Sequence, residues 1–156
     1  MARIEFVGID EYLDSLDQLG KKSKGLCKRA LYDGAAVLAD AVRAEVQSLP
    51  TTDVNGDPQE VLEYEKEGLL EGLGITKMKD ENGRIRTRVD FDGYNRLRSK
   101  KYPNGHPNSM IARAINSGSS TRKKNPFMAR AVKKAKAKAE AAMAARMDAD
   151  IKEIMK

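Results

Sequence analysis

The sequence has one cysteine, one histidine and no tryptophan, and these shortages exclude several classes of protein. A single Cys27 cannot form an internal disulfide framework and gives no spacing for a metal site. No run of 18 apolar residues occurs, so the sequence predicts no transmembrane helix. The segment from Met1 to Glu5 lacks the apolar core of a signal peptide, and a cytosolic origin is therefore expected.

Catalytic and metal-binding motifs are also missing. His106 has no acidic or thiol neighbour in sequence, and the chain contains no P-loop, dinucleotide-binding turn or nucleophile elbow. Residues 53–57 look briefly like a calcium loop, but the position that needs glycine holds Pro58 and the one that needs glutamate holds Tyr64. We expect no enzyme activity, no metal and no cofactor. An enzyme with a carboxylate site is the least favoured option.

Charge is distributed unevenly along the 156 residues. Residues 1–83 carry 10 Lys and Arg against 17 Asp and Glu, whereas residues 84–138 carry 16 against 2. Residues 139–156 carry 3 against 4. This asymmetry suits a nucleic acid or an acidic protein surface, including the acidic half of a neighbouring copy. A solvated basic face is the simpler alternative.

The N-terminal third predicts one strand and two helices. Alternating apolar residues indicate a short strand near residues 3–7, and a helix follows from about 11 to 19. Gly20 is a typical helix stop, and a second helix is expected from about 23 to 48. Its small residues predict close packing against another helix, and Cys27 is expected to be a small buried residue. Three leucines of the first helix are expected to face inward: Leu13, Leu16 and Leu19.

The middle of the chain predicts a helix over 60–73 and a β-hairpin formed by 75–79 and 84–91. Asn82-Gly83 between the two strands is the strongest short signal for a hairpin turn. Alternation predicts an apolar face of Ile85, Thr87, Val89 and Phe91, and a polar face that contains Arg84, Arg86 and Arg88. A basic loop over 92–109 and a short helix or strand over 110–115 follow.

A long helix is predicted from Pro126 to about Met155, with Asn125 as its N-cap. Apolar residues recur along it at steps of four and form one stripe: Phe127, Ala131, Ala135, Ala139, Met143, Met147, Ile151 and Met155. Such a stripe requires a partner surface, either in the rest of this chain or in another subunit.

These elements predict a single α+β domain over 1–156, with a small antiparallel sheet packed against a long helix of the N-terminal half and a long C-terminal helix. Its parts are a strand and two helices (1–50), a loop (51–59), a helix, hairpin and basic loop (60–120) and the C-terminal helix (121–156).

Three stretches, in this order, carry a resemblance to a known family. The first is Phe6 to Leu13, which continues through Leu16 and Leu19 into a long alanine-containing helix ending at Pro50. The second is Gly68-Leu69-Leu70 followed by a hairpin. The third is Ala112 to Ser120 and, after a gap, Asn125 to Val132. This order resembles the HK97-type tail-component family of tailed phages, which are neck or tail-completion proteins.

The resemblance implies a structural virion protein without enzyme activity, which joins head and tail. It implies a homo-oligomeric ring, six-fold to match the tail, around the DNA channel. The implied partners are copies of itself, head-closure or connector proteins, and tail terminator or tail tube proteins. Non-specific contact with DNA in the channel is a further option. The implied location is the head–tail junction of the virion, and the host cytoplasm during assembly.

Two sets of residues are candidates for contacts. The candidate subunit interface is Phe127, Met128, Arg130 and Met143, although its apolar members suit an intrachain core equally well. The candidate basic surface, toward a partner or the DNA channel, is Arg84, Arg86, Arg88, Arg96, Arg98, Lys100, Lys101, Arg122, Lys123 and Lys124. Acidic and basic surfaces that complement each other would guide ring assembly. The alternative function is that of a small basic nucleic-acid-binding protein.

Overall fold

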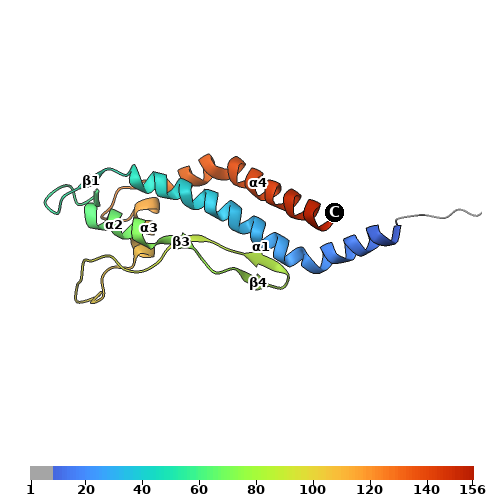
Figure 1. Cartoon of the computed structure of the whole chain (residues 1–156). Coiled ribbons are helices and arrows are strands. Elements are labelled where there is room, and N and C mark those ends of the chain that lie inside the picture. The colour runs from blue at the N-terminus through green and yellow to red at the C-terminus, as the bar shows by residue number, and fades with distance from the viewer. Residues whose placement is uncertain (1–8) are drawn as a thin grey trace, which may run out of the picture.

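The computed structural model describes residues 9–156, and within them the chain is an α+β fold dominated by two long helices (Figure 1). The predicted fold class is confirmed. The predicted strand near residues 3–7 lies outside the described residues. The elements are α1 (Ile9–Gln47), β1 (Thr51–Thr52), β2 (Val61–Leu62), α2 (Glu63–Gly72), β3 (Leu73–Ile75), β4 (Lys79–Glu81), β5 (Arg84–Arg86), β6 (Val89–Phe91), α3 (Asn108–Ser117) and α4 (Phe127–Ile154).

The prediction of two separate N-terminal helices was wrong, because α1 runs without a break from Ile9 to Gln47. Gly20 lies inside the helix, and a Cβ at this position would meet nothing within 4 Å. A glycine in a helix costs only about 1 kcal/mol relative to alanine, whereas starting a new helix requires a costly nucleus. Local pairs also support the helix at this point, since Lys21 Nζ lies 2.6 Å from Asp17 Oδ2.

Helix α4 lies along α1 (Figure 1). Phe127, Ala131 and Ala135 of the stripe are buried. The helices come close at Gly34, where a Cβ would lie only 2.6 Å from Cγ of Met143. The partner of the stripe is therefore the rest of the same chain, and the predicted close packing of the small residues of α1 is confirmed.

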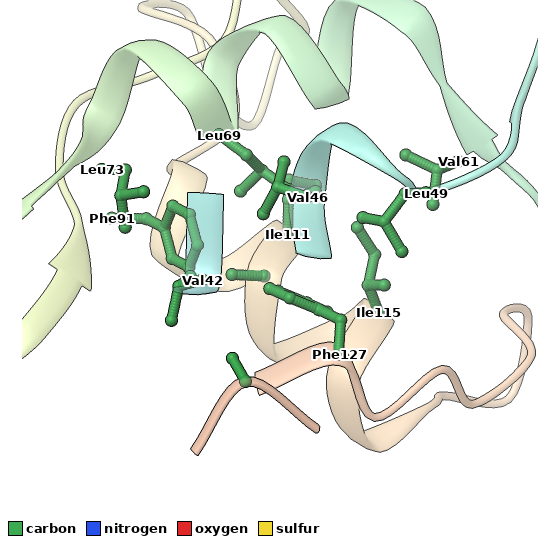
Figure 2. Close-up of a cluster of buried hydrophobic side chains, with 12 residues drawn as sticks. Val42, Val46, Leu49, Val61, Leu69, Leu73, Phe91, Ile111, Ile115 and Phe127 are labelled. Atoms are coloured by element: carbon green, nitrogen blue, oxygen red, sulfur yellow. The ribbon is translucent and has the colours of Figure 1, made fainter. Parts of the chain in front are cut away.

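The main core lies where α1, α2, α3, β6 and the start of α4 converge. Figure 2 shows ten of its twelve residues with labels: Val42, Val46, Leu49, Val61, Leu69, Leu73, Phe91, Ile111, Ile115 and Phe127. Phe127 is fully buried, and its ring meets that of Phe91 edge-on at a centroid distance of 6.1 Å. Because both rings and parts of these five elements meet here, this end of the molecule is the part held by the most apolar burial.

The predicted hairpin is confirmed, but it is divided into two short ladders. Strands β3 and β6 pair next to the core, and β4 pairs with β5 at the tip. Asn82 and Gly83 both have positive φ, 54° and 80°, as a two-residue hairpin turn requires. Between the ladders, threonine side chains add to the backbone pairing, in which the amide of Thr76 donates to the carbonyl of Arg88 at 2.8 Å. Thr87 Oγ1 donates to the carbonyl of Thr76 at 2.7 Å.

The start of α4 differs from the prediction, since Asn125 is not its N-cap. The amide of Met128 donates instead to Oδ1 of Asn116, a residue of α3, at 3.1 Å. The side chain of Asn125 accepts a hydrogen bond from Arg130 at 2.7 Å, while the backbone amide of Asn125 donates to the carbonyl of Ile115. Asn116 of α3 thus caps α4, in place of the predicted Asn125.

Several side chains of α1 point elsewhere than predicted. Cys27 is exposed, because its neighbours Leu26 and Ala30 occupy the buried side of the helix and Cys27 is rotated about 100° from Leu26. Leu13 and Leu16 were expected to face inward, yet they are 53% and 40% exposed. No described element covers that part of α1, whereas α4 covers the rest of the helix.

Candidate assembly surfaces

A buried glutamate joins the two long helices. Glu45 of α1 is only 5% exposed and receives hydrogen bonds from two residues of α4, Arg130 Nε at 2.9 Å and Lys134 Nζ at 2.5 Å. The hydrogen bond from Lys134 is the main cause that lowers the pKa of Glu45 below its usual value, with Arg130 adding to it and burial opposing it. Glu45 is therefore ionised at neutral pH and fixes the register between α1 and α4.

A second acid–base pair joins α2 to the segment before α4. Arg122 donates to both carboxylate oxygens of Glu65, at 2.8 and 3.0 Å. The same carboxylate accepts the amide of Leu62 at 3.0 Å and so caps the start of α2. Both side chains are largely buried, so Arg122 serves the fold rather than an open basic surface.

These ion pairs join the acidic N-terminal half of the chain to its basic segment. Glu45 and Glu65 belong to the acidic N-terminal half, and Arg122, Arg130 and Lys134 belong to the basic segment. The attraction between the two halves is thus partly intrachain. A partner can contact only the charged residues of each half that stay exposed.

The four candidate interface residues lie in different environments. Phe127 is in the core, Met128 is partly buried against it, and Arg130 is held by Glu45 and Asn125. Met143 packs on Gly34 and borders an open groove. Of the two roles that the sequence left open for the apolar members, the intrachain one describes Phe127. Met143 borders the groove, and Arg130, whose side chain is 42% exposed, borders a smaller pocket.

The candidate basic residues do not form one surface. The arginines of the hairpin lie near the N-terminal part of α1, where Lys24 Nζ donates to Asp80 Oδ2 at 2.8 Å. The loop over 92–107, which holds Arg96, Arg98, Lys100 and Lys101, lies at the opposite end of the molecule (Figure 1). Lys123 and Lys124 are exposed on the segment before α4. The chain therefore presents separate basic patches.

The basic loop is folded around a buried asparagine. Oδ1 of Asn95 accepts the amides of Leu97 and His106, each at 3.1 Å, and the backbone of Asn95 also bonds to His106. The His106 ring packs on the Tyr102 ring at a centroid distance of 4.8 Å. Lys101 Nζ lies 5.5 Å from the centroid of the same ring. His106 thus takes part in loop structure, with its ring packed on that of Tyr102.

An open groove runs between α4 and the hairpin, with α1 as its floor. Its volume is about 1060 Å³. Apolar side chains from all three walls line it, among them Leu31 and Leu38 of α1, Ile85 and Val89 of the hairpin, and Val132 and Met143 of α4. Val132 is 49% exposed, so the apolar lining is accessible from outside. The apolar stripe of α4 consists of alanines here, among them Ala135 and Ala139. Because these side chains are small, they leave the space of the groove unfilled.

The rim of the groove is mainly basic. Five cations stand along it against two acids: Lys77, Lys79, Arg86, Arg88 and Lys136 against Glu81 and Glu140. All seven residues are exposed. Two of the candidate basic residues, Arg86 and Arg88, thus belong to this groove.

The N-terminal part of α1 projects past the body of the molecule. In Figure 1, α1 continues beyond the C-terminal end of α4. Ile154 at the end of α4 borders the same small pocket as Gln18 and Lys22, so residues 9–17 form an extension that we call the arm. Two exposed leucines of the arm, Leu13 and Leu16, were missed as contact candidates. Their spacing is a correct signal of an apolar helix face, but the sequence does not say that this face is left uncovered.

Among residues 9–156 no group of three or more His, Cys, Asp and Glu side chains could hold a metal ion. In the same range no helix is long and apolar enough to cross a membrane. Comparison of the chain with protein-family models, with curated proteins and with solved structures finds no match.

Proposed function

We propose that this chain is a structural subunit of the neck or tail-completion ring of a tailed phage, without enzyme activity, which joins the head to the tail. The observation that carries the proposal is the pair of uncovered apolar surfaces, the groove and the arm, which lie at two separate places along α1. Subunits of rings need such surfaces because each contacts a neighbour on two sides. The order of sequence stretches that resembles the HK97-type tail-component family supports the same function.

In this function, copies of the chain assemble around the DNA channel as a homo-oligomeric ring, with six subunits to match the tail. Head-closure or connector proteins lie on one side of the ring and tail terminator or tail tube proteins on the other. The separate basic patches suit contacts with more than one neighbour, or with DNA in the channel.

The test is disruption of the gene in its phage or prophage, followed by negative-stain electron microscopy of the induced lysate. We expect separate DNA-filled heads and tails, or tails with aberrant upper ends. A complementing copy of the gene should restore joined particles. Intact and infectious particles without the gene would overturn the proposal.

A second candidate is that of a small nucleic-acid-binding protein, and one observation favours it. The loop over 92–107 presents four basic residues beside Tyr94, whose side chain is 58% exposed. An exposed aromatic ring among cations is an arrangement that stacks on bases and neutralises phosphates. Since the patch is small and other basic residues lie far from it, we rank this candidate second.

A further inference from the structure

We infer that the groove between α4 and the hairpin receives the arm of a second copy of this chain. The inference deepens the proposed function by naming the contact between neighbouring subunits, and it rests on that function in taking the chain to work as several copies. Its observations are the exposed leucines of the arm, the apolar lining of the groove, and the charges that flank each of them.

The arm has the form of a helix that docks in an apolar groove. Leu13 and Leu16 stand three residues apart and therefore lie on one side of α1. Glu11, Asp14 and Asp17 recur at the same spacing in an adjacent row, and all three are exposed. Helices with an apolar row and a charged row bind grooves through the apolar side chains, while the charges set orientation.

The groove complements both rows of the arm. Its lining is aliphatic, and its volume of about 1060 Å³ is open to solvent along the exposed Val132. Its rim carries five cations against two acids, whereas residues 9–17 of the arm carry four acids and no cation. The arm and the rim thus have opposite charge, which favours this pairing over arm with arm, where acidic rows would repel.

The arm cannot fill the groove of its own chain. The groove borders residues 31–38 of α1, and the arm belongs to the same continuous helix. From Leu16 to Gly34 the helix rises by about 27 Å, at 1.5 Å per residue. Since the helix holds these segments apart, only the arm of another copy can reach the groove. Such a contact joins two different surfaces, so repetition of it produces a closed ring or an open filament.

The experiment uses the full chain with cysteines at chosen places. Cys27→Ser removes the natural thiol. In that background Glu11→Cys marks the arm, Glu140→Cys marks the rim of the groove, and Asp40→Cys marks an exposed site on α1 outside the groove as a control. None of these changes removes an apolar contact. Equimolar mixtures are treated with a short bismaleimide at several protein concentrations, and the cross-linked dimers are measured.

We expect several-fold more cross-linked dimer from the arm–groove mixture than from either variant mixed with the control. The combined change Leu13→Ser and Leu16→Ser in the arm variant should reduce this yield to the control level. These leucines are exposed, so circular dichroism should show a folded protein throughout. Asp14→Lys in the arm should also reduce the yield, and Lys136→Glu in the groove variant should restore part of it.

Several results would overturn the inference. They are no dimer above the control level, a dimer formed mainly between two arm variants, or a yield that the leucine changes leave unaltered. An intrachain cross-link in a monomer that carries both Glu11→Cys and Glu140→Cys would show that the arm folds back. Native mass spectrometry would detect a small apolar molecule bound to the protein. If the protein stayed monomeric after its removal, the groove would be assigned to a ligand rather than to the arm.

The two proposals fail in different ways. An arm–groove cross-link together with intact particles from the disrupted phage would keep this inference and overturn the neck assignment. Separated heads and tails without any arm–groove cross-link would keep the neck assignment and overturn this inference.

Discussion

At the scale of single residues, buried charges carry the specific contacts of this chain. Glu45 is almost fully buried and bridges α1 to α4 through Arg130 and Lys134, while Glu65 holds Arg122 with two hydrogen bonds. Hydrogen bonds to charged groups contribute about 1.5–3 kcal/mol each, and removal of one partner leaves the other without its counter-charge. These residues therefore fix the arrangement of helices that apolar contacts alone would leave adjustable.

Glu45→Gln tests the bridge through the pH dependence of stability. The pKa of Glu45 is lowered in the folded state, so its ionised form favours folding above the unfolded pKa near 4.5, and this contribution is lost as the pH falls through the lower, folded pKa. The variant should lose about 1–3 kcal/mol of unfolding free energy at pH 7. Urea unfolding between pH 7 and pH 3 should show a smaller decrease of stability on acidification in the variant than in the natural protein.

The matched control is Glu71→Gln, because Glu71 is an exposed glutamate of α2. This change should leave stability at pH 7 within about 0.5 kcal/mol. Equal pH profiles for Glu45→Gln and the natural protein would contradict the role of Glu45.

Gly34 tests the close contact between α1 and α4. A Cβ at Gly34 would lie 2.6 Å from Cγ of Met143, the flexible side chain of a methionine, which can move. Gly34→Ala should change stability by less than about 1 kcal/mol, since the higher helix propensity of alanine offsets the displacement. Gly34→Leu should cost about 1–3 kcal/mol, because the larger side chain overpacks the contact.

Thermal unfolding measures both changes, and Met143→Ala provides the relief test. If the contact limits the size of residue 34, Met143→Ala should recover part of the loss in Gly34→Leu. A full additive loss in the double variant would show that the two residues do not interact.

At the scale of elements, the ends of helices depend on neighbours in space. Helix α1 passes through Gly20 because the cost of one glycine is small, and it ends where Pro50 and the turn at Ser48 stop it. Helix α4 starts at Phe127 with a cap from α3. The hairpin turn at Asn82 and Gly83 is set by its own residues, since both adopt positive φ.

Asn116→Ala tests the cap that α3 gives to α4. Loss of the hydrogen bond to the amide of Met128 should cost about 0.5–2 kcal/mol, as for a local helix cap. Urea unfolding of this variant measures the loss. Asn125→Ala is the comparison, because Asn125 bonds to the Arg130 side chain rather than to a helix amide. A larger loss for Asn125→Ala would mean that the side-chain bond matters more than the cap.

At the scale of the whole molecule, the distribution of charge decides what the chain attracts. The net charge of +6 is divided among separate patches, and part of the basic segment is paired within the chain. A ring subunit of the proposed kind needs attraction to particular neighbours and little affinity for free DNA.

We therefore expect the isolated protein to bind duplex DNA weakly at low salt and not at physiological salt. Fluorescence anisotropy against salt concentration measures this, and the triple change Arg98→Ala, Lys100→Ala and Lys101→Ala should reduce the low-salt binding. Glu71→Gln again serves as a control. Tight binding that persists at physiological salt and falls by a logarithmic slope of about 0.9 per phosphate contact would favour the nucleic-acid-binding candidate.

Local patterns by themselves determined much of this protein. The spacing of apolar residues in α4, the Asn-Gly turn and the alternation of arginines with apolar residues in the second strand of the hairpin each correctly predicted an element, because these signals act over a few neighbouring residues. The α+β class followed from these elements. Met143 packs on Gly34 and borders the groove, so its contact with another subunit stays a prediction.

Only the tertiary structure decided which apolar faces are covered. Leu13 and Phe127 both belong to regular helix stripes, yet Leu13 is half exposed and Phe127 is fully buried. The cap from Asn116, the pairing of Glu45 with residues 85 and 89 positions away, and the groove also depend on segments distant in sequence. The physical reason is that burial is a property of the packed arrangement, since a periodic stripe specifies a face but not the element that lies against it.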